Sequence, residues 1–171
     1  MNFSKITKKV ASFSVEGKTK EAALWLLQIF DIQDDYFAGF EYREKANPDF
    51  ILMTTEGEFG EPQKIRIPEN TFEFPLPLML SLLAHEMVHV RQKTRQPYIL
   101  DRNEREWQAY YQMLFKNVFP LVPDISTYHK KAFANKALEY YNRMEPNGAL
   151  QQKYANQKQE VEQFLKTLEN Q

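Results

Sequence analysis

Two histidines and a glutamate lie close together near the middle of the chain, in the segment His85-Glu86-Met87-Val88-His89. Residues four positions apart lie on one face of an α-helix, so the imidazoles of His85 and His89 can bind one metal ion together. Glu86 points about 100° away around the helix, which suits a carboxylate that contacts a water molecule and does not bind the metal itself. The segment therefore predicts a metal site with a proton acceptor beside it.

The alternative is that both histidines are ordinary hydrogen-bonded residues of a buried helix. The surrounding segment is apolar on nearly all sides, so three adjacent polar side chains would be buried there without evident partners. Two of the three histidines in the chain are in this segment, and we therefore favour metal binding. The chain has no cysteine, so the ligands must be histidines and carboxylates. Glycine-rich phosphate loops and the GxSxG pattern of serine hydrolases are also absent.

The spacing resembles that of the zincin metallopeptidases, and more narrowly that of a minimal gluzincin. In those proteins the HExxH helix supplies two zinc ligands, and a glutamate on the following helix, often within an E-x-x-A pattern, supplies the third. The segment Glu106-Trp107-Gln108-Ala109 matches that pattern. The resemblance extends over about a quarter of the chain, from Phe74 to Phe115. It implies a Zn²⁺ cofactor bound by His85, His89 and Glu106.

The third ligand has competitors. Glu104 begins the same predicted helix as Glu106, and helical periodicity places the two glutamates on opposite sides of the apolar stripe without choosing between them. Asp101 is a more distant candidate. The extended HExxHxxGxxH pattern of the metzincins is absent, because positions 92 and 95 are glutamine and arginine. A third histidine ligand would have to be His129.

The resemblance also implies an activity, the zinc-dependent hydrolysis of peptide bonds in a peptide or protein substrate, with Glu86 as the general base. An alternative is a catalytically latent or inactive zincin fold that acts as a protein-binding module. We expect His129 to be a surface residue near a helix start. The donor that stabilises the oxyanion remains open among His129, Tyr98, Tyr110, Tyr111 and Tyr128.

The elements that must position these residues indicate an α+β fold. One helix is predicted before a small, three-stranded, mostly antiparallel sheet, and four helices follow, the first of which carries the HExxH segment. Pro68 follows the third strand, which therefore ends there or lies at an edge. We expect an extended peptide substrate to add itself to that edge near Ile65–Ile67. The predicted helices and strands are Lys18–Phe30, Phe37–Tyr42, Phe50–Thr55, Lys64–Ile67, Leu78–Lys93, a helix from Asp101 or Asn103 to before Pro120, Ser126–Met144 and Leu150–Leu168.

Length and composition predict one domain over residues 1–171, with an amphipathic C-terminal helix over 150–171 that packs on the body, covers a cleft or binds a partner helix. The 22 basic and 23 acidic residues nearly cancel to a net charge of −1. Nothing in this balance favours nucleic acid or an anionic membrane as a partner. No apolar run approaches the roughly 18 residues of a membrane-spanning helix, and we expect a soluble, cytoplasmic protein.

Overall fold

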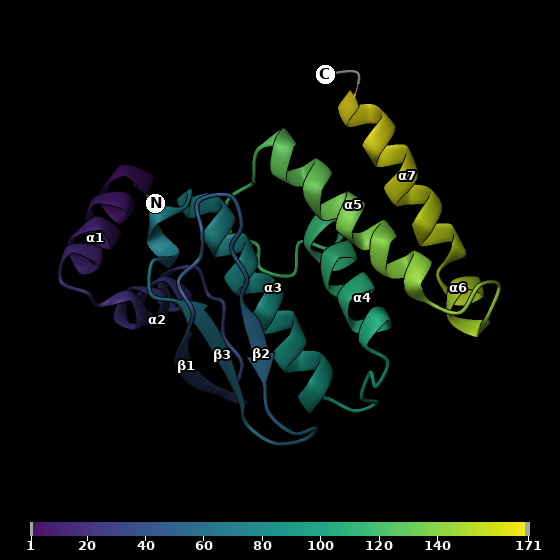
Figure 1. Cartoon of the computed structure of the whole chain (residues 1–171), viewed down its shortest axis with the longest axis horizontal. Coiled ribbons are helices and arrows are strands. Elements are labelled where there is room, and N and C mark those ends of the chain that lie inside the picture. The colour runs from purple at the N-terminus through teal and green to yellow at the C-terminus, as the bar shows by residue number, and fades with distance from the viewer. Residues whose placement is uncertain (1, 170–171) are drawn as a thin grey trace.

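The computed structural model describes residues 2–169 and confirms an α+β fold with a three-stranded sheet. The central helix α3 lies between the sheet and a group of helices formed by the C-terminal half of the chain (Figure 1). In chain order the elements are α1 (Phe3–Val15), α2 (Thr19–Ile29), β1 (Phe37–Arg43), β2 (Thr54–Glu56), β3 (Gln63–Pro68), the 3₁₀ helix η1 (Thr71–Glu73), α3 (Leu76–Thr94), α4 (Arg102–Phe115), α5 (Thr127–Arg143), α6 (Ala149–Lys153) and α7 (Ala155–Glu169).

Helix α1 is absent from the predicted elements. It buries only Ile6 and Val10, one turn apart, so its apolar stripe is too narrow to stand out in the sequence. The side chain of Asn2 caps it by accepting a hydrogen bond from the backbone N–H of Lys5. The predicted C-terminal helix is interrupted at Tyr154 into α6 and α7, and residues 170 and 171 of the predicted tail lie outside the described residues.

The strand order is β1-β3-β2, so β3 is the central strand of the sheet. Strands β1 and β3 pair in parallel, whereas β2 and β3 are antiparallel. The sheet is therefore mixed and not mostly antiparallel. The prediction of an edge at Ile65–Ile67 is wrong, because this segment pairs on both sides; Pro68 only ends the strand. The edge beside α3 is β2.

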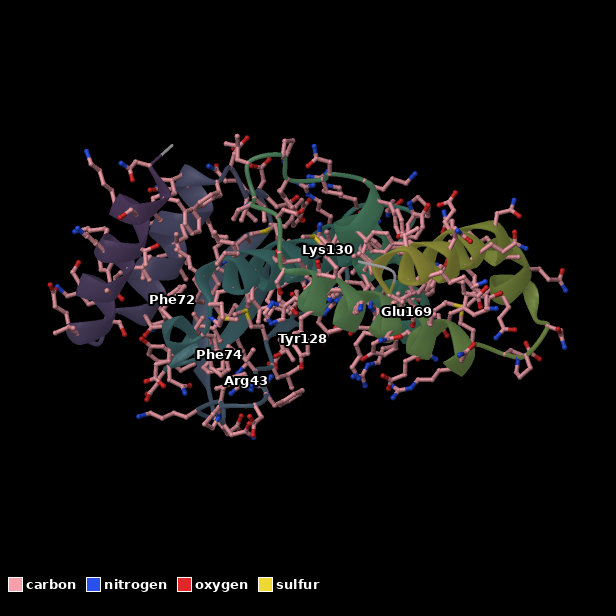
Figure 2. All side chains as sticks on the ribbon, turned by 90° about the horizontal axis from the view of Figure 1, so that it is seen from above. Arg43, Phe72, Phe74, Tyr128, Lys130 and Glu169 are labelled. Carbon is pink, nitrogen blue, oxygen red and sulfur yellow. The ribbon has the colours of Figure 1, made fainter. Side chains whose placement is uncertain are left out.

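Two groups of apolar side chains form the core. The larger one joins α1, α2, the sheet and α3, and the smaller one joins α4 to the last three helices around the fully buried Trp107. Viewed from above, α1 and α2 lie at one end of the molecule and α7 at the other (Figure 2). Helix α7 packs against the body through the buried Val161 and Leu168, which is one of the alternatives considered for the tail.

Helix α3 follows Pro75, and Pro77 lies in its first turn, where a missing backbone N–H costs no helical hydrogen bond. It is buried on most of its surface because it packs between the two halves of the molecule. Within residues 2–169, no helix combines the length and the apolar character needed to cross a membrane.

Candidate metal centre

Helix α3 brings His85 and His89 together as their spacing predicts. Their side chains leave the same face one turn apart, and their Nε2 atoms lie 3.1 Å from each other. The residues are 3% and 7% exposed. The two ring nitrogens therefore meet at one point that is largely shielded from water.

The orientation of His89 is set by Gln92, one turn further along α3. The Oε1 atom of Gln92 lies 2.7 Å from Nδ1 of His89, and the amide of Gln92 donates to the backbone oxygen of Arg105 at 3.0 Å. An acceptor at Nδ1 holds the proton there, which leaves a lone pair on Nε2. By contrast, Nδ1 of His85 has no hydrogen-bond partner among residues 2–169, and its ring lies against that of Tyr110 with centroids 4.3 Å apart.

Glu106 reaches the same point from α4. Its Oε2 atom lies 3.5 Å from Nε2 of His85 and 3.4 Å from Nε2 of His89. Burial raises the pKa of Glu106, but the two neighbouring imidazoles outweigh burial and bring that pKa well below its usual range. For His89, burial lowers the pKa, while the carboxylates of Glu106 and Glu86 and the contact with Gln92 raise it; the net shift is upward.

The three atoms form a nearly equilateral triangle with sides of 3.1, 3.4 and 3.5 Å. Tetrahedral ligands at the usual zinc bond lengths of about 2.0–2.1 Å lie about 3.3 Å from one another. The donor set and its spacing therefore fit one small dication bound by two imidazoles and one carboxylate.

Glu86 is also close, and the His85, Glu86 and His89 side chains form a buried group that could hold a metal ion, with ligand atoms within 4.8 Å of one another. Its carboxylate has another partner: the hydroxyl of Thr55 on β2 lies 2.8 Å from Oε2 of Glu86 and 2.9 Å from its backbone oxygen. The Oε2 atom of Glu106 lies 3.5 and 3.4 Å from the two histidine Nε2 atoms, well within the same 4.8 Å. The structure thus brings Glu106 into the triangle and holds Glu86 beside it.

The competing acids have other contacts. Glu104 is on the opposite side of α4, where its Oε1 accepts hydrogen bonds from Tyr154 at 2.5 Å and from Lys153 at 2.8 Å. Asp101 is the N-cap of α4, and its Oδ1 accepts from the backbone N–H of Glu104 at 2.8 Å. Neither of these acids is among the residues that line the cleft described next.

A cleft of about 420 Å³ opens over the triangle. Residues 50–56, which include β2, form one wall; α3 forms the floor; α4 and α5 form the other wall. Tyr110 on α4 and Tyr140 on α5 line this second wall, with their rings stacked at 6.2 Å. No residue of α6 or α7 lines the cleft, so the described part of the tail does not cover it.

Most candidates for the oxyanion donor lie elsewhere. His129 is at the start of α5, where Nδ1 lies 3.0 Å from the hydroxyl of Ser126, and Tyr128 beside it is 77% exposed (Figure 2). Tyr111 donates to Glu160 on α7. Tyr98 packs against Phe59. Of the residues proposed from the sequence for this role, Tyr110 alone lines the cleft.

Sequence reasoning missed two residues that orient the site. Gln92 is three positions after His89 on the same helix, so its spacing alone could have identified it as a neighbour. Thr55 could not have been found in this way, because only the packing of β2 on α3 brings it to Glu86. Comparison of the chain with protein-family models, with curated proteins and with solved structures finds no match in any of the three.

Proposed function

We propose that the protein is a zinc-dependent metallopeptidase with the ligands His85, His89 and Glu106. The observation that carries this proposal is the triangle of their Nε2, Nε2 and Oε2 atoms, with sides of 3.1 to 3.5 Å. The set of two histidines and one carboxylate, without cysteine, is a common catalytic set for zinc and leaves one coordination position free. The sequence resemblance to the zincins points the same way.

A zinc ion in this position would supply Lewis acidity, which lowers the pKa of a water molecule and polarises a substrate carbonyl. Glu86 would accept the proton of the attacking water and return it to the leaving amine. Thr55 supports this role, because its hydroxyl lies 2.8 Å from Oε2 of Glu86 and holds the carboxylate at the floor of the cleft. Gln92 would keep the Nε2 atom of His89 available as a ligand.

The substrate in this proposal is an extended peptide that lies along β2. One side of β2 pairs with β3, while residues 50–56 line the cleft directly beside Glu86. An unpaired strand edge presents backbone N–H and C=O groups that can pair with a peptide. We therefore propose β2 as the strand that binds the substrate, since Ile65–Ile67 is inside the sheet.

Tyr110 is our candidate for the donor that stabilises the oxyanion. Burial and the nearby Glu106 carboxylate raise the pKa of its hydroxyl, so it keeps its proton near neutral pH. The hydroxyl makes no hydrogen bond to any residue from 2 to 169, so its proton is available to a ligand in the cleft. Tyr140, stacked on Tyr110, is the alternative donor from the same wall.

The test begins with metal analysis of protein prepared without a histidine tag and reconstituted with zinc. We expect one zinc per chain and hydrolysis of an unbiased peptide library, with loss of both in the double variant His85→Ala/His89→Ala. The Glu86→Gln variant should keep its zinc and lose hydrolysis. Absence of bound zinc after reconstitution would refute the metal site. Stoichiometric zinc without hydrolysis would instead favour the alternative of a latent or inactive fold that binds other proteins.

A further inference from the structure

One end of the cleft is formed by three basic side chains, Lys93, Arg102 and Arg105, which we call the cationic end. Lys93 lies one helical turn beyond His89 on α3. Arg102 lies one turn before Glu106 on α4, and Arg105 directly precedes it. The three positive charges thus come from both helices that supply the candidate ligands, and they lie on the same side of those ligands.

No carboxylate lies within ion-pair distance of any of these three side chains in residues 2–169, although all three line the cleft. Lys93 donates to the backbone oxygen of Gly57 at 2.5 Å, and Arg105 donates to those of Ile99 and Leu100 at 2.9 and 2.7 Å. These contacts hold the two side chains in place without a direct ion pair, although Glu56 and Glu58 act on the charge of Lys93 from a longer distance, and Glu106 and Asp101 on that of Arg105.

The charges are also crowded. The ammonium group of Lys93 and the guanidinium group of Arg105 lie 5.6 and 5.4 Å from the ring centroid of Phe59. Burial, together with the like charge of Arg105, lowers the pKa of Lys93. Half-buried cations that repel each other bind an anion more favourably than isolated, solvated ones, because the anion relieves the repulsion.

Arg102 is the free member of the group. Its side chain is exposed and makes no hydrogen bond or ion pair with residues 2–169. Two acids near this end have other partners: Asp101 caps α4, and Glu56 lies 3.5 Å from Arg66. Glu106, one turn further along α4, is a proposed zinc ligand. A planar guanidinium with all its donors free is suited to a two-point contact with a carboxylate.

The other end of the cleft has a different character. Thr55 contacts Glu86 and Gly57 contacts Lys93, so β2 and α3 run in the same direction along the cleft. The residues before β2 therefore lie at the end away from Lys93, and there Phe50 and Leu52 are 59% and 43% exposed. Lys136, which also lines the cleft, differs from the three basic side chains of the cationic end because it lies 2.7 Å from a carboxylate, that of Glu139. The cleft is apolar at one end, and its other end has the three basic side chains together with the carboxylate of Glu56.

We propose that the cationic end binds a carboxylate of the substrate, so that the protein selects peptides with an acidic side chain or a free C-terminus on that side of the bond to be cut. This inference rests on the proposed peptidase function. One helical turn from His89 to Lys93 rises about 6 Å, and an extended peptide advances about 3.3 Å per residue. The selected carboxylate therefore belongs about two residues from the scissile bond.

The first experiment uses zinc-loaded protein and one peptide library made twice, with free and with amidated C-termini. We expect cleavage products with Asp or Glu enriched at one fixed position if a side chain is bound. If the terminal carboxylate is bound, cleavage occurs at a fixed distance from the free C-terminus and is lost in the amidated library. Products without an acidic preference in either library would overturn the proposal while leaving the peptidase function in place.

Arg102→Gln and Arg102→Glu test the assignment without removing any contact of the fold. Loss of one charge-assisted contact worth about 1 kcal/mol should reduce the preference for acidic over neutral peptides about fivefold in Arg102→Gln, and Arg102→Glu should reduce it further. Lys8→Gln on α1 removes the same charge far from the cleft and should leave the preference unchanged. Equal preferences in Arg102→Gln and Lys8→Gln would overturn the assignment.

A second experiment measures binding without turnover. The zinc-loaded Glu86→Gln variant is titrated with acetyl-triglutamate amide and with acetyl-triglutamine amide. We expect the glutamate peptide to bind more tightly than the glutamine peptide, and Arg102→Gln to weaken that binding. This result would support carboxylate binding at the cationic end even if no peptide is hydrolysed. In that case only the peptidase proposal would fail. Equal binding of the two probes contradicts the carboxylate site.

Discussion

The Oε1 atom of Gln92 lies 2.7 Å from Nδ1 of His89, and the amide of the same side chain donates to the backbone of Arg105 next to Glu106. One glutamine therefore orients a ring on α3 and ties it to the helix that carries the third candidate ligand. The contact is buried, and a correctly placed acceptor there determines the tautomer of the ring.

Replacing Gln92 with Leu should weaken zinc binding by about tenfold to a hundredfold, the usual cost of removing a partner that orients a metal-bound histidine. Leucine keeps most of the side-chain volume, so the fold should persist. Competition with a chromophoric zinc chelator measures the affinity. Gln112→Leu on α4, whose side chain makes no hydrogen bond within the described residues, is the matched control. An unchanged affinity in Gln92→Leu would show that the contact does not orient His89.

The two glutamates of α4 should separate metal binding from stability. Glu106→Gln should reduce zinc affinity by more than the change at Gln92, because a candidate ligand loses its charge. Glu104→Gln should leave zinc binding intact and lower the free energy of unfolding by roughly 1–3 kcal/mol, since the buried carboxylate accepts from Tyr154 and Lys153. Chelator competition measures the zinc affinity of both variants, and urea denaturation measures their free energy of unfolding. The reverse pattern would make Glu104 the ligand.

The contrast between these glutamates shows what a sequence pattern can and cannot predict. The meeting of His85 and His89 follows from helical spacing alone, which is a local property. The choice between Glu104 and Glu106 depends on which side of α4 faces α3. In the structure Glu104 contacts Lys153 and Tyr154, which are about 50 residues away in the sequence, whereas Glu106 contacts the two histidines of α3.

The sheet shows the same division. Strands β1 and β3 lie close to the predicted runs, and Pro68 marks the end of β3, whereas β2 contains only the last two residues of the predicted run Phe50–Thr55. Their order is not local information, because the parallel pairing of β1 with β3 places the last strand between the other two. The edge beside α3 is therefore β2, the strand that contains Thr55. This is also the strand on which we propose that a peptide substrate binds. No pattern within the three strands identifies β2 as the edge.

The pH dependence of zinc affinity should extend to higher pH than for an isolated histidine pair. The pKa of His89 is raised from 6.5 because the nearby carboxylates and Gln92 outweigh the effect of burial, and zinc binds only the neutral ring. In the metal-free protein a raised pKa stabilises the fold below pH 6.5, and this contribution is lost as pH rises through the shifted value. Zinc stabilises the fold only by binding the neutral ring, so its contribution increases as pH rises. The rise in melting temperature on adding zinc should therefore grow with pH above 6.5.

Glu86→Gln provides the check on this pH dependence. It removes one of the charges that raise the pKa of His89 but none of the three proposed ligands. The onset of zinc binding should therefore move to lower pH in Glu86→Gln, as measured by calorimetric titration at a series of pH values. An onset at the same pH in both proteins would mean that Glu86 does not act on His89 through its charge.

The contact between Tyr154 and Glu104 should stabilise the fold without affecting zinc. The hydroxyl of Tyr154 donates to Oε1 of Glu104 at 2.5 Å in a buried position, while its ring packs near Trp107 at a centroid distance of 6.2 Å. Phenylalanine keeps the ring and removes the donor from a buried carboxylate, so Tyr154→Phe should cost roughly 1–3 kcal/mol in urea denaturation. Tyr128→Phe, at a position that is 77% exposed, should cost nothing measurable. Glu106 faces the opposite side of α4, so the zinc content of Tyr154→Phe should stay at one ion per chain. Loss of zinc in this variant would mean that the C-terminal helices hold α4 in the position that brings Glu106 to the two histidines.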